Sequence, residues 1–214
     1  MTDKLRKLMT ALERNNMQAF YAENKTEALE LIKNILPKGG TVTHGGSMTL
    51  QECGVTALLK QGPYKYLDRN AEGLTPVQIE EIYRQSFFAD AYITSANAVT
   101  MDGLLYNVDG NSNRVAAILY GPKEVIFMIG INKIVENLEQ AVERVKAIAA
   151  PKNTVRLNCA TYCKEKGHCV AKEGEPMGAG CASDGRICCN YVVSAKQRQK
   201  NRMKVIIVNE ELGY

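Results

Sequence analysis

The sequence lacks several features that would assign it to a class at once. Its longest apolar run, residues 125–131, is far too short to cross a bilayer. The first seven residues are charged and have no apolar stretch behind them, so we expect no secretory signal. These two absences together predict a cytoplasmic protein without a membrane-spanning segment.

Charge of a single sign is equally scarce. The 214 residues include 27 basic and 23 acidic side chains, which gives a net charge of +4. This bias is too weak to predict binding to nucleic acid. The sequence also has no internal repeat and no low-complexity tract. We therefore expect a small-molecule substrate, and neither a nucleic acid nor a membrane as partner.

Hydrophobic spacing indicates alternating helices and strands. Apolar residues at three- and four-residue intervals predict helices at 3–15, 25–36 and 132–150. Another helix should open at Thr75-Pro76, with Thr as N-cap and Pro at its first position, and one more should run from about residue 49 through Leu59. The β-prone stretches are 17–22, 41–43, 64–67, 91–94 and 124–129. This order predicts an α/β fold with a layered, mostly parallel sheet and helices on both faces.

We expect one domain over residues 1–214. Helical periodicity stops at Pro151, where the cysteines begin, and residues 205–208 are β-branched enough to return to the sheet. Residues 151–190 are therefore predicted to be a cysteine-rich, metal-binding excursion inserted before the last strand.

A glycine pair, Gly45-Gly46, lies between a predicted strand and a predicted helix. Glycines let a ligand approach the backbone closely, and a helix start offers free N–H groups to an anion. The hydroxyls of Ser47 and Thr49 could add donors, and His44 lies beside the turn. The segment lacks the Lys and the third Gly of nucleotide-binding loops. A tight turn with Ser47 as helix cap explains the same residues and is the alternative.

The stretch 95–114 concentrates polar side chains after a predicted buried strand. Because ligands of open α/β sheets bind beyond the carboxyl ends of the strands, this stretch is predicted to be a pocket wall. Asp102 is the candidate general acid–base or hydroxyl binder, and Arg114 is the candidate anion clamp. Two Asp-Gly pairs are also typical of turns around a short hairpin, which is sufficient to explain Asp109. The other candidate ligand-binding side chains are Asn97, Asn107 and Asn113.

Asn132 and Lys133 follow the second buried strand and open the long predicted helix. A lysine at a helix N-terminus opposes the helix dipole. This local conflict indicates that Lys133 serves a ligand or a fixed partner, while a solvated lysine is the alternative.

Six of the seven cysteines lie between residues 159 and 189. In a reducing compartment, such a cluster indicates metal or redox chemistry and not a disulfide scaffold. The spacings contain neither the C-x2-C pair of a zinc ribbon nor a ferredoxin run. Four thiolates suit an iron–sulfur cluster of the 4Fe–4S type or zinc. The predicted ligands are Cys163, Cys169, Cys181 and Cys188, with Cys159, Cys189 and His168 as alternates.

Five segments in order resemble the lactate-utilisation (LUD) family. They are Gly45-Gly46-Ser47-Met48-Thr49-Leu50-Gln51-Glu52, Ser95-Ala96-Asn97-Ala98-Val99-Thr100-Met101-Asp102-Gly103, Asn113-Arg114-Val115-Ala116-Ala117, Gly121-Pro122-Lys123-Glu124-Val125 and Gly130-Ile131-Asn132-Lys133-Ile134. The resemblance implies a NagB/RpiA/CoA-transferase-like fold. It also implies that the Gly-Gly-Ser loop, up to Glu52, and the Asp102 segment face the pocket of the family.

The resemblance further implies a place in bacterial oxidation of L-lactate, a 2-hydroxy acid, to pyruvate, together with iron–sulfur companion subunits. Gly167-His168-Cys169 and Arg186-Ile187-Cys188 are similar to a subgroup of the family. Cys181, however, is separated from Cys169 by more residues than that subgroup has, so an insertion or a different third ligand is implied.

Two other functions fit the same residues. One is an enzyme or sensor for a phosphorylated or CoA-linked metabolite, with a structural zinc in the cysteine segment. The other is a non-catalytic binding module in which the metal only stabilises the C-terminal loop. Fold class does not choose among them, because one fold hosts many chemistries. Catalysis by this chain alone and assembly into a homo-oligomer are both left open by the sequence.

Overall fold

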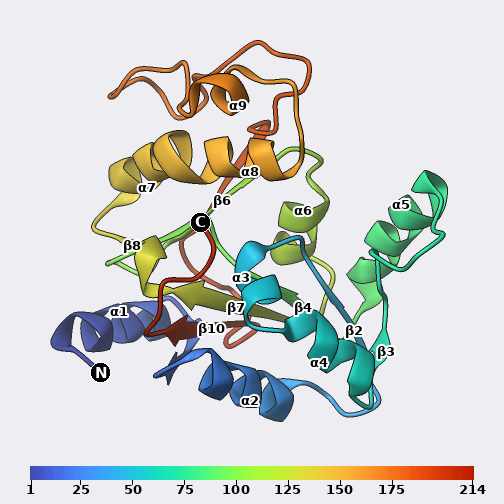
Figure 1. Cartoon of the computed structure of the whole chain (residues 1–214). Coiled ribbons are helices and arrows are strands. Elements are labelled where there is room, and N and C mark those ends of the chain that lie inside the picture. Colours follow the sequence, from blue (N-terminus) through green and yellow to red (C-terminus); the bar gives the residue numbers. More distant parts are fainter.

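The central sheet of the computed structural model, which describes residues 1–214, has six strands that are all parallel (Figure 1). Residues 125–130 are all buried, as expected for a strand covered on both faces. Residues 205–208 lie in the middle of this sheet, so the chain returns to it after the cysteine-rich segment. In spatial order the strands are β1 (Gln18–Ala22), β10 (Met203–Val208), β7 (Glu124–Gly130), β4 (Ala91–Thr94), β2 (Thr41–His44) and β3 (Lys65–Tyr66).

Three helices cover one face of the sheet. Ile32, Leu50 and Leu59 from these helices are buried in one cluster with Ile93 and Ile126 of the sheet. Apolar side chains at helical spacing thus meet alternate side chains of the strands, which excludes water from this layer. The helices are α2 (Lys25–Ile35), α3 (Met48–Glu52) and α4 (Val55–Gln61).

The prediction of a single helix through Leu59 is wrong, because the structure has two helices in this segment, α3 and α4. Gly54 lies between them with a φ of +73°, a left-handed conformation that interrupts the helical hydrogen bonds and that glycine adopts at little cost. Cys53, next to it, is buried in the α2–α4 layer.

The other face of the sheet is covered by two helices and a smaller, four-stranded sheet. Leu5, Leu8 and Leu12 pack in one cluster with Phe127 of β7. The predicted hairpin at the first Asp-Gly pair is confirmed, since β5 and β6 are antiparallel neighbours. These elements are α1 (Asp3–Arg14), α6 (Asn113–Leu119), β8 (Ile134–Val135), β5 (Ala98–Thr100), β6 (Leu105–Asp109) and β9 (Asn190–Ser194).

The prediction of a helix over residues 132–150 is wrong at both ends. Its start is replaced by a 3-10 turn, Ile131–Lys133, and by β8, and α7 (Leu138–Arg144) begins after the N-cap Asn137. At the other end the chain continues through a π-helical turn, Val145–Ala149, into α8 (Ala150–Arg156). Because Pro151 has no N–H to donate, a widened turn before it lets the helix pass through the proline.

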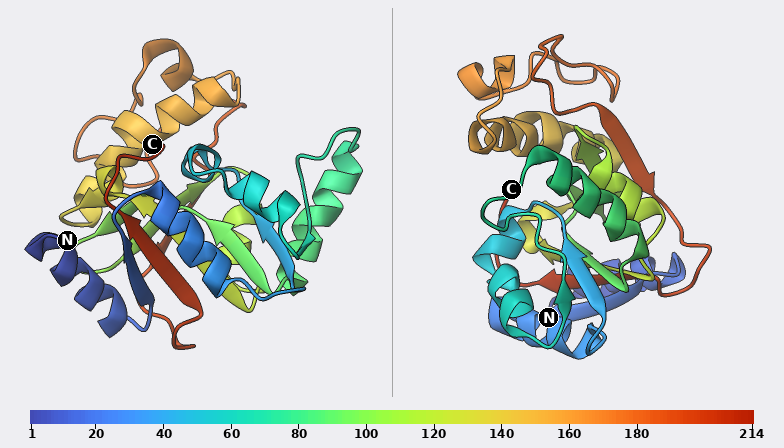
Figure 2. Two further views of the ribbon diagram at one scale, coloured as in Figure 1. Left: turned by 60° about the horizontal axis from the view of Figure 1, so that its bottom comes forward. Right: turned by 90° about the vertical axis from the view of Figure 1, so that its right-hand side faces the viewer.

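Helix α5 (Pro76–Gln85) projects from the body of the molecule and has no buried residue (Figures 1 and 2). Thr75 and Gln78 form a capping box at its start, and Pro76 occupies the first turn, as predicted. Local capping rather than core burial therefore stabilises this helix.

The cysteine-rich segment lies over α7 and α8, at one end of the molecule (Figures 1 and 2). It contains α9 (Tyr162–Lys166), and residues 167–189 have no helix or strand. No helix in the structure has both the length and the apolar character needed to span a bilayer.

Candidate functional site

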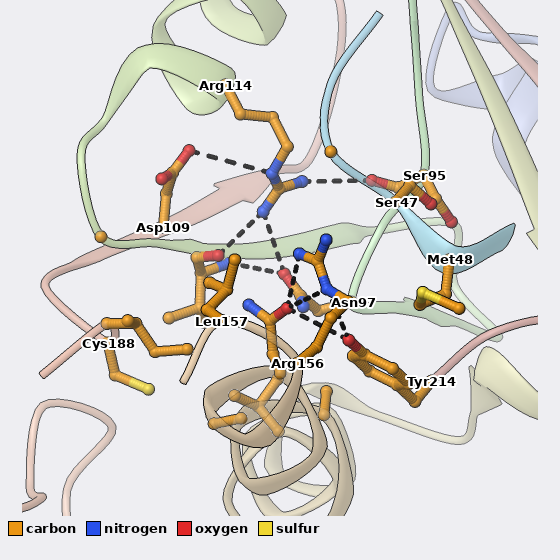
Figure 3. Close-up of a pocket in the computed structure, with 18 of the residues that line it drawn as sticks. Ser47, Met48, Ser95, Asn97, Asp109, Arg114, Arg156, Leu157, Cys188 and Tyr214 are labelled. Atoms are coloured by element: carbon orange, nitrogen blue, oxygen red, sulfur yellow. Dashed lines mark hydrogen bonds and ion pairs between the residues drawn. The ribbon is translucent and has the colours of Figure 1, made fainter. Parts of the chain in front are cut away.

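A cavity of about 320 Å³ opens where the segments following β2, β4 and β7 meet α8 (Figure 3). This volume is at the lower end of the range for small-molecule sites. In a parallel sheet, such an edge beyond the carboxyl ends of the strands is where ligands bind. The charged side chains that line the cavity are Arg69, Asp109, Arg114, Lys133 and Arg156.

The structure brings half of the predicted ligand-binding and catalytic residues into this cavity. Ser47 accepts a hydrogen bond from the Leu50 N–H at 3.5 Å and caps α3, so the cap interpretation of Ser47 is confirmed while the residue also faces the cavity. The predicted residues that line the cavity are Gly46, Ser47, Asn97, Asn113, Arg114 and Lys133.

Arg114 is engaged by protein acceptors on both of its terminal nitrogens. Nη1 donates to the Ser95 carbonyl at 3.1 Å and to Asn107 Oδ1 at 2.7 Å. Nη2 donates to Asn97 Oδ1 at 3.2 Å and to the Val108 carbonyl at 2.8 Å. The guanidinium therefore fixes the cavity wall and has no free pair of N–H groups for a ligand. Burial lowers the pKa of Arg114, and Asp109 offsets part of that effect.

Asp109 is the only carboxylate that lines the cavity. One of its oxygens lies 3.8 Å from Arg114 Nε and accepts a hydrogen bond from the Val115 N–H at 3.1 Å. Asp109 thus ties the start of α6 to the cavity wall, a role beyond the turn residue that the Asp-Gly pair predicted.

Lys133 is almost fully buried beside the cavity, with 2% of its surface exposed. Its Nζ donates to Thr49 Oγ1 at 2.7 Å and to Ser95 Oγ at 3.0 Å, both of which are neutral acceptors. Burial, together with the nearby charges of Arg144 and Arg114, lowers the pKa of Lys133 to about 7. The side chain can therefore hold or release a proton near neutral pH.

Two further arginines converge above the glycine turn. An atom in the Cβ position of Gly46 would lie 3.2 Å from Arg69 Nη2 and 3.9 Å from Arg156 Nη2. Arg69 stacks over the Tyr83 ring at 5.1 Å, and Arg156 donates to the Tyr214 hydroxyl at 2.9 Å. Neither arginine forms an ion pair with a carboxylate.

Three predicted residues support the cavity from behind rather than line it. Glu52 accepts a hydrogen bond from the Gly213 N–H at 2.8 Å, and Asn132 bonds to both Leu212 and Gly213. Thr49 donates to the Leu212 carbonyl at 3.1 Å. Together these contacts hold residues 212–214, which places the Tyr214 side chain in the cavity wall (Figure 3).

The remaining predicted residues lie outside the cavity. Asp102 is exposed in the β5–β6 turn, where its carboxylate accepts a hydrogen bond from Thr100 and its carbonyl accepts one from Asn15. That position removes Asp102 from reach of a ligand in the cavity, so it is a turn residue. Asn107 is fully buried behind Arg114, and the Gly45 N–H continues the pairing of β2 with β4.

His44 is buried at the end of β2 and does not line the cavity. Its ring stacks on Tyr66 at 5.8 Å, and Nδ1 lies 2.8 Å from the Gly45 carbonyl. Burial lowers its pKa, which favours the neutral ring. These contacts assign His44 to the packing of the sheet edge.

A second, smaller cavity of about 30 Å³ lies between α7, α8 and the cysteine-rich segment. All four predicted metal ligands line it: Cys163, Cys169, Cys181 and Cys188. The alternates Cys159, Cys189 and His168 do not line it. No three His, Cys, Asp or Glu side chains are already placed to hold a metal ion.

The thiols of this second cavity differ in acidity. Burial and the proximity of Cys163 and Cys169 raise the pKa of Cys188 to about 12. Burial alone would also raise the pKa of Cys181, but hydrogen bonds from Ser183 and the charge of Arg186 lower it overall. Thiols that affect one another in this way lie close together in space.

Sequence reasoning missed several residues of the larger cavity. Arg69 follows β3, Tyr83 belongs to α5, and Arg156 ends α8, so each is far from the predicted pocket segments along the chain. No local motif surrounds any of them. Arg69 reaches the cavity as the continuation of β3, Tyr83 reaches it from α5, and the packing of α8 and of residues 212–214 against the sheet edge brings Asn153, Arg156 and Tyr214 there.

The comparisons with known proteins agree with this architecture. The family model of the LUD domain matches residues 5–208. The chain belongs to the LUD domain family. A role related to lactate utilisation, which gives the family its name, therefore applies to it in general. No curated protein matches the sequence at a significant level.

A solved structure shows the same fold at low sequence identity. The LUD chain is similar to a DUF162 family protein from Deinococcus radiodurans, with a TM-score of 0.53 and 12% identity over 96% of both chains. Ribose 5-phosphate isomerase A from Methanocaldococcus jannaschii aligns with 92% of this chain and 83% of its own, at 14% identity and a TM-score of 0.33, which carries no argument.

Proposed function

We propose that the larger cavity binds a small anionic 2-hydroxy acid of the L-lactate class, as a component of L-lactate oxidation to pyruvate. One observation carries this proposal: Arg69, Lys133 and Arg156 line the cavity without a carboxylate partner. Positive charges held in a cavity are costly unless an anion compensates them. A bound carboxylate would supply that compensation.

The cavity offers a hydrogen-bonding partner to each polar group of a 2-hydroxy acid. A guanidinium offers two parallel N–H groups to a carboxylate, so Arg69 is the expected bidentate ligand. Nε and Nη2 of Arg156 already donate to Asn153 Oδ1, at 3.1 and 2.8 Å, so Nη1 of Arg156 is the expected further donor. The hydroxyls of Ser47 and Tyr214 are the expected partners of the 2-hydroxyl group. Lys133, whose pKa is about 7, is the expected acceptor of the hydroxyl proton.

Oxidation of a 2-hydroxy acid to a 2-oxo acid releases two electrons and two protons. Lys133 can take the hydroxyl proton, and the second proton, which comes from C2, is released to solvent as the two electrons leave. The side chains of this cavity include no electron acceptor. We therefore propose that the electrons pass to iron–sulfur companion subunits, as the resemblance to the family implied. Membership of the LUD domain family supports this assignment.

Calorimetric titration of the full chain with L-lactate tests the proposal. Removing a charged hydrogen-bond donor costs about 1.5–3 kcal/mol, so Arg69→Gln and Arg156→Gln should each weaken binding about tenfold or more. Arg198→Gln, which changes an exposed arginine outside the cavity, is the matched control and should bind as the unaltered protein does. Absence of binding, or equal weakening in all three variants, would contradict the proposal.

A phosphorylated metabolite is the second candidate, because Arg69 and Arg156 together with a partly protonated Lys133 offer more positive charge than a single carboxylate compensates. Inorganic phosphate and a sugar phosphate should then raise the melting temperature more than L-lactate does at equal concentration. A larger shift with L-lactate would favour the first candidate, since at equal concentration the ligand with the lower Kd stabilises the fold more.

A further inference from the structure

We infer that this chain carries its own metal site, formed by the thiolates of Cys163, Cys169, Cys181 and Cys188 in the smaller cavity. The four residues come from α9, from the start and the interior of the loop that follows it, and from the segment just before β9. Core packing of isolated cysteines would not place four of them around one cavity of about 30 Å³.

The fold sorts the seven cysteines into ligands and bystanders. Cys53 is buried in the α2–α4 layer, on the far side of the central sheet from the small sheet that carries β9. Cys159 and Cys189 are close along the chain to residues that line the cavity, but neither of them lines it. Cys189 is exposed. Four thiols around one cavity match the tetrahedral sulfur coordination of zinc and of iron–sulfur clusters.

Charged and polar neighbours complete the site. Four thiolates with a divalent ion, or with a cubane cluster in its 2+ state, leave about two negative charges. Arg186 and Lys146 both line the cavity and supply two positive charges. Thr161 places its hydroxyl 3.5 Å from Cys163 Sγ, where it can donate to a thiolate. The Thr154 hydroxyl lies 3.6 Å from the same sulfur but donates to the Pro151 carbonyl at 2.8 Å.

Arg186 also holds the ligand loop together before any metal binds. Its side chain donates to the carbonyls of Cys181 at 3.0 Å, Cys188 at 2.9 Å and Gly178 at 2.8 Å. The four thiols surround a space rather than a point, so ligation requires their side chains to turn inward. Rotation of the cysteine side chains about χ1 is the adjustment required, while Arg186 keeps the backbone of the loop in place.

Cys188 connects the two cavities. It lines both of them, as do Val145, Ala150 and Ile187, and Figure 3 shows it at the edge of the larger cavity. A metal bound through Cys188 would therefore lie directly behind the wall of the anion site. This last step rests on the proposed function, whereas the metal site itself does not.

Metal analysis of the full chain, purified without oxygen, tests the site. We expect either about one zinc per chain and no colour, or about four iron atoms with a broad visible band that bleaches on reduction. Cys163→Ser, Cys169→Ser, Cys181→Ser and Cys188→Ser should each lose most of the metal. The matched controls Cys159→Ser and Cys189→Ser should keep it. The inference is overturned if the chain binds neither zinc nor iron after reconstitution, or if the control variants lose as much metal as the ligand variants.

A second measurement on the unaltered protein avoids variants that fail to fold. The metal-loaded chain should protect four thiols from an alkylating reagent, and a chelator should expose them to modification, with mass spectrometry placing the change at Cys163, Cys169, Cys181 and Cys188. Protection of a different set would overturn the site. If the metal is present but L-lactate does not bind, the metal site stands and the proposed function fails.

Discussion

Lys133 shows how burial sets the charge of the cavity at the scale of one residue. Its pKa is about 7 in the folded protein, against about 10.4 for an exposed lysine. An anion is attracted by the protonated form alone. We expect L-lactate binding to weaken as the pH rises from 6 to 8, and Lys133→Met to bind weakly at every pH. Calorimetry at several pH values measures this, and a flat profile for the unaltered protein would contradict it.

The same pKa shift affects stability. Between pH 7 and about 10, the unfolded chain holds the Lys133 proton and the folded chain does not, so the free energy of unfolding gains a contribution that rises with pH. Lys133→Met should reduce that rise in urea unfolding experiments. Lys196→Met, which changes an exposed lysine, should retain it.

Arg114 is the second residue whose role follows from its surroundings. A lysine cannot reproduce its four hydrogen bonds to Ser95, Asn97, Asn107 and Val108. We expect Arg114→Lys to lower the free energy of unfolding by about 2 kcal/mol, because several buried acceptors lose their donor. Denaturant unfolding measures the change, and an effect below about 0.5 kcal/mol would show that water replaces the guanidinium.

At the scale of elements, the break between α3 and α4 depends on one glycine. Gly54 has a φ of +73° and no neighbouring atom within 4 Å of a Cβ position. Gly54→Ala should therefore destabilise the fold through backbone strain alone, by about 1–2 kcal/mol. Gly54→Asn should cost less, since asparagine tolerates this conformation. Equal stability of both variants and the unaltered protein would contradict the left-handed assignment.

The segment 209–214 shapes the cavity through Gly213. Its φ is +58°, and a Cβ there would lie 2.7 Å from Thr49 Oγ1. We expect Gly213→Ala to displace Tyr214, to weaken anion binding several-fold and to lower the melting temperature, because both its φ and the close approach of Thr49 disfavour a Cβ. Gly174→Ala, at a φ of +78° with open space around it, is the control and should bind normally.

At the scale of the whole molecule, stability resides in the central sheet and not in the projecting α5 region. Phe127 is fully buried in β7 within the cluster that joins the sheet to α1, whereas Phe88 is 87% exposed. Phe127→Ala should lower the free energy of unfolding by about 3–5 kcal/mol, and Phe88→Ala should change it by less than about 0.5 kcal/mol. Comparable effects of the two changes would show that Phe88 is covered in solution.

The sequence determined the parts of this fold that depend on local spacing. The β-prone stretches predicted five of the six strands of the central sheet, with each end within about two residues of the observed end. The sixth strand, β10, was predicted from its β-branched residues 205–208. Helix caps such as Thr75 were readable, because the capping side chain and its partner are three residues apart. The continuation of the helix through Pro151 could not be predicted from the sequence, since the compensating π-helical turn is a property of the packed helix.

The site depends on both levels. Gly46, Ser47, Asn97 and Lys133 could be predicted, because each follows a strand, and parallel strands end at one edge of the sheet. Arg156 and Tyr214 could not be, because helix α8 and residues 212–214 reach that edge only through tertiary packing. Arg69 follows the predicted strand β3, so the same rule could have found it. The sequence by itself determined the strands, their common edge and the cysteine cluster. Only the tertiary structure decided which charges face one another and which cysteines share a cavity, because distance in space is set by packing across layers and not by spacing along the chain.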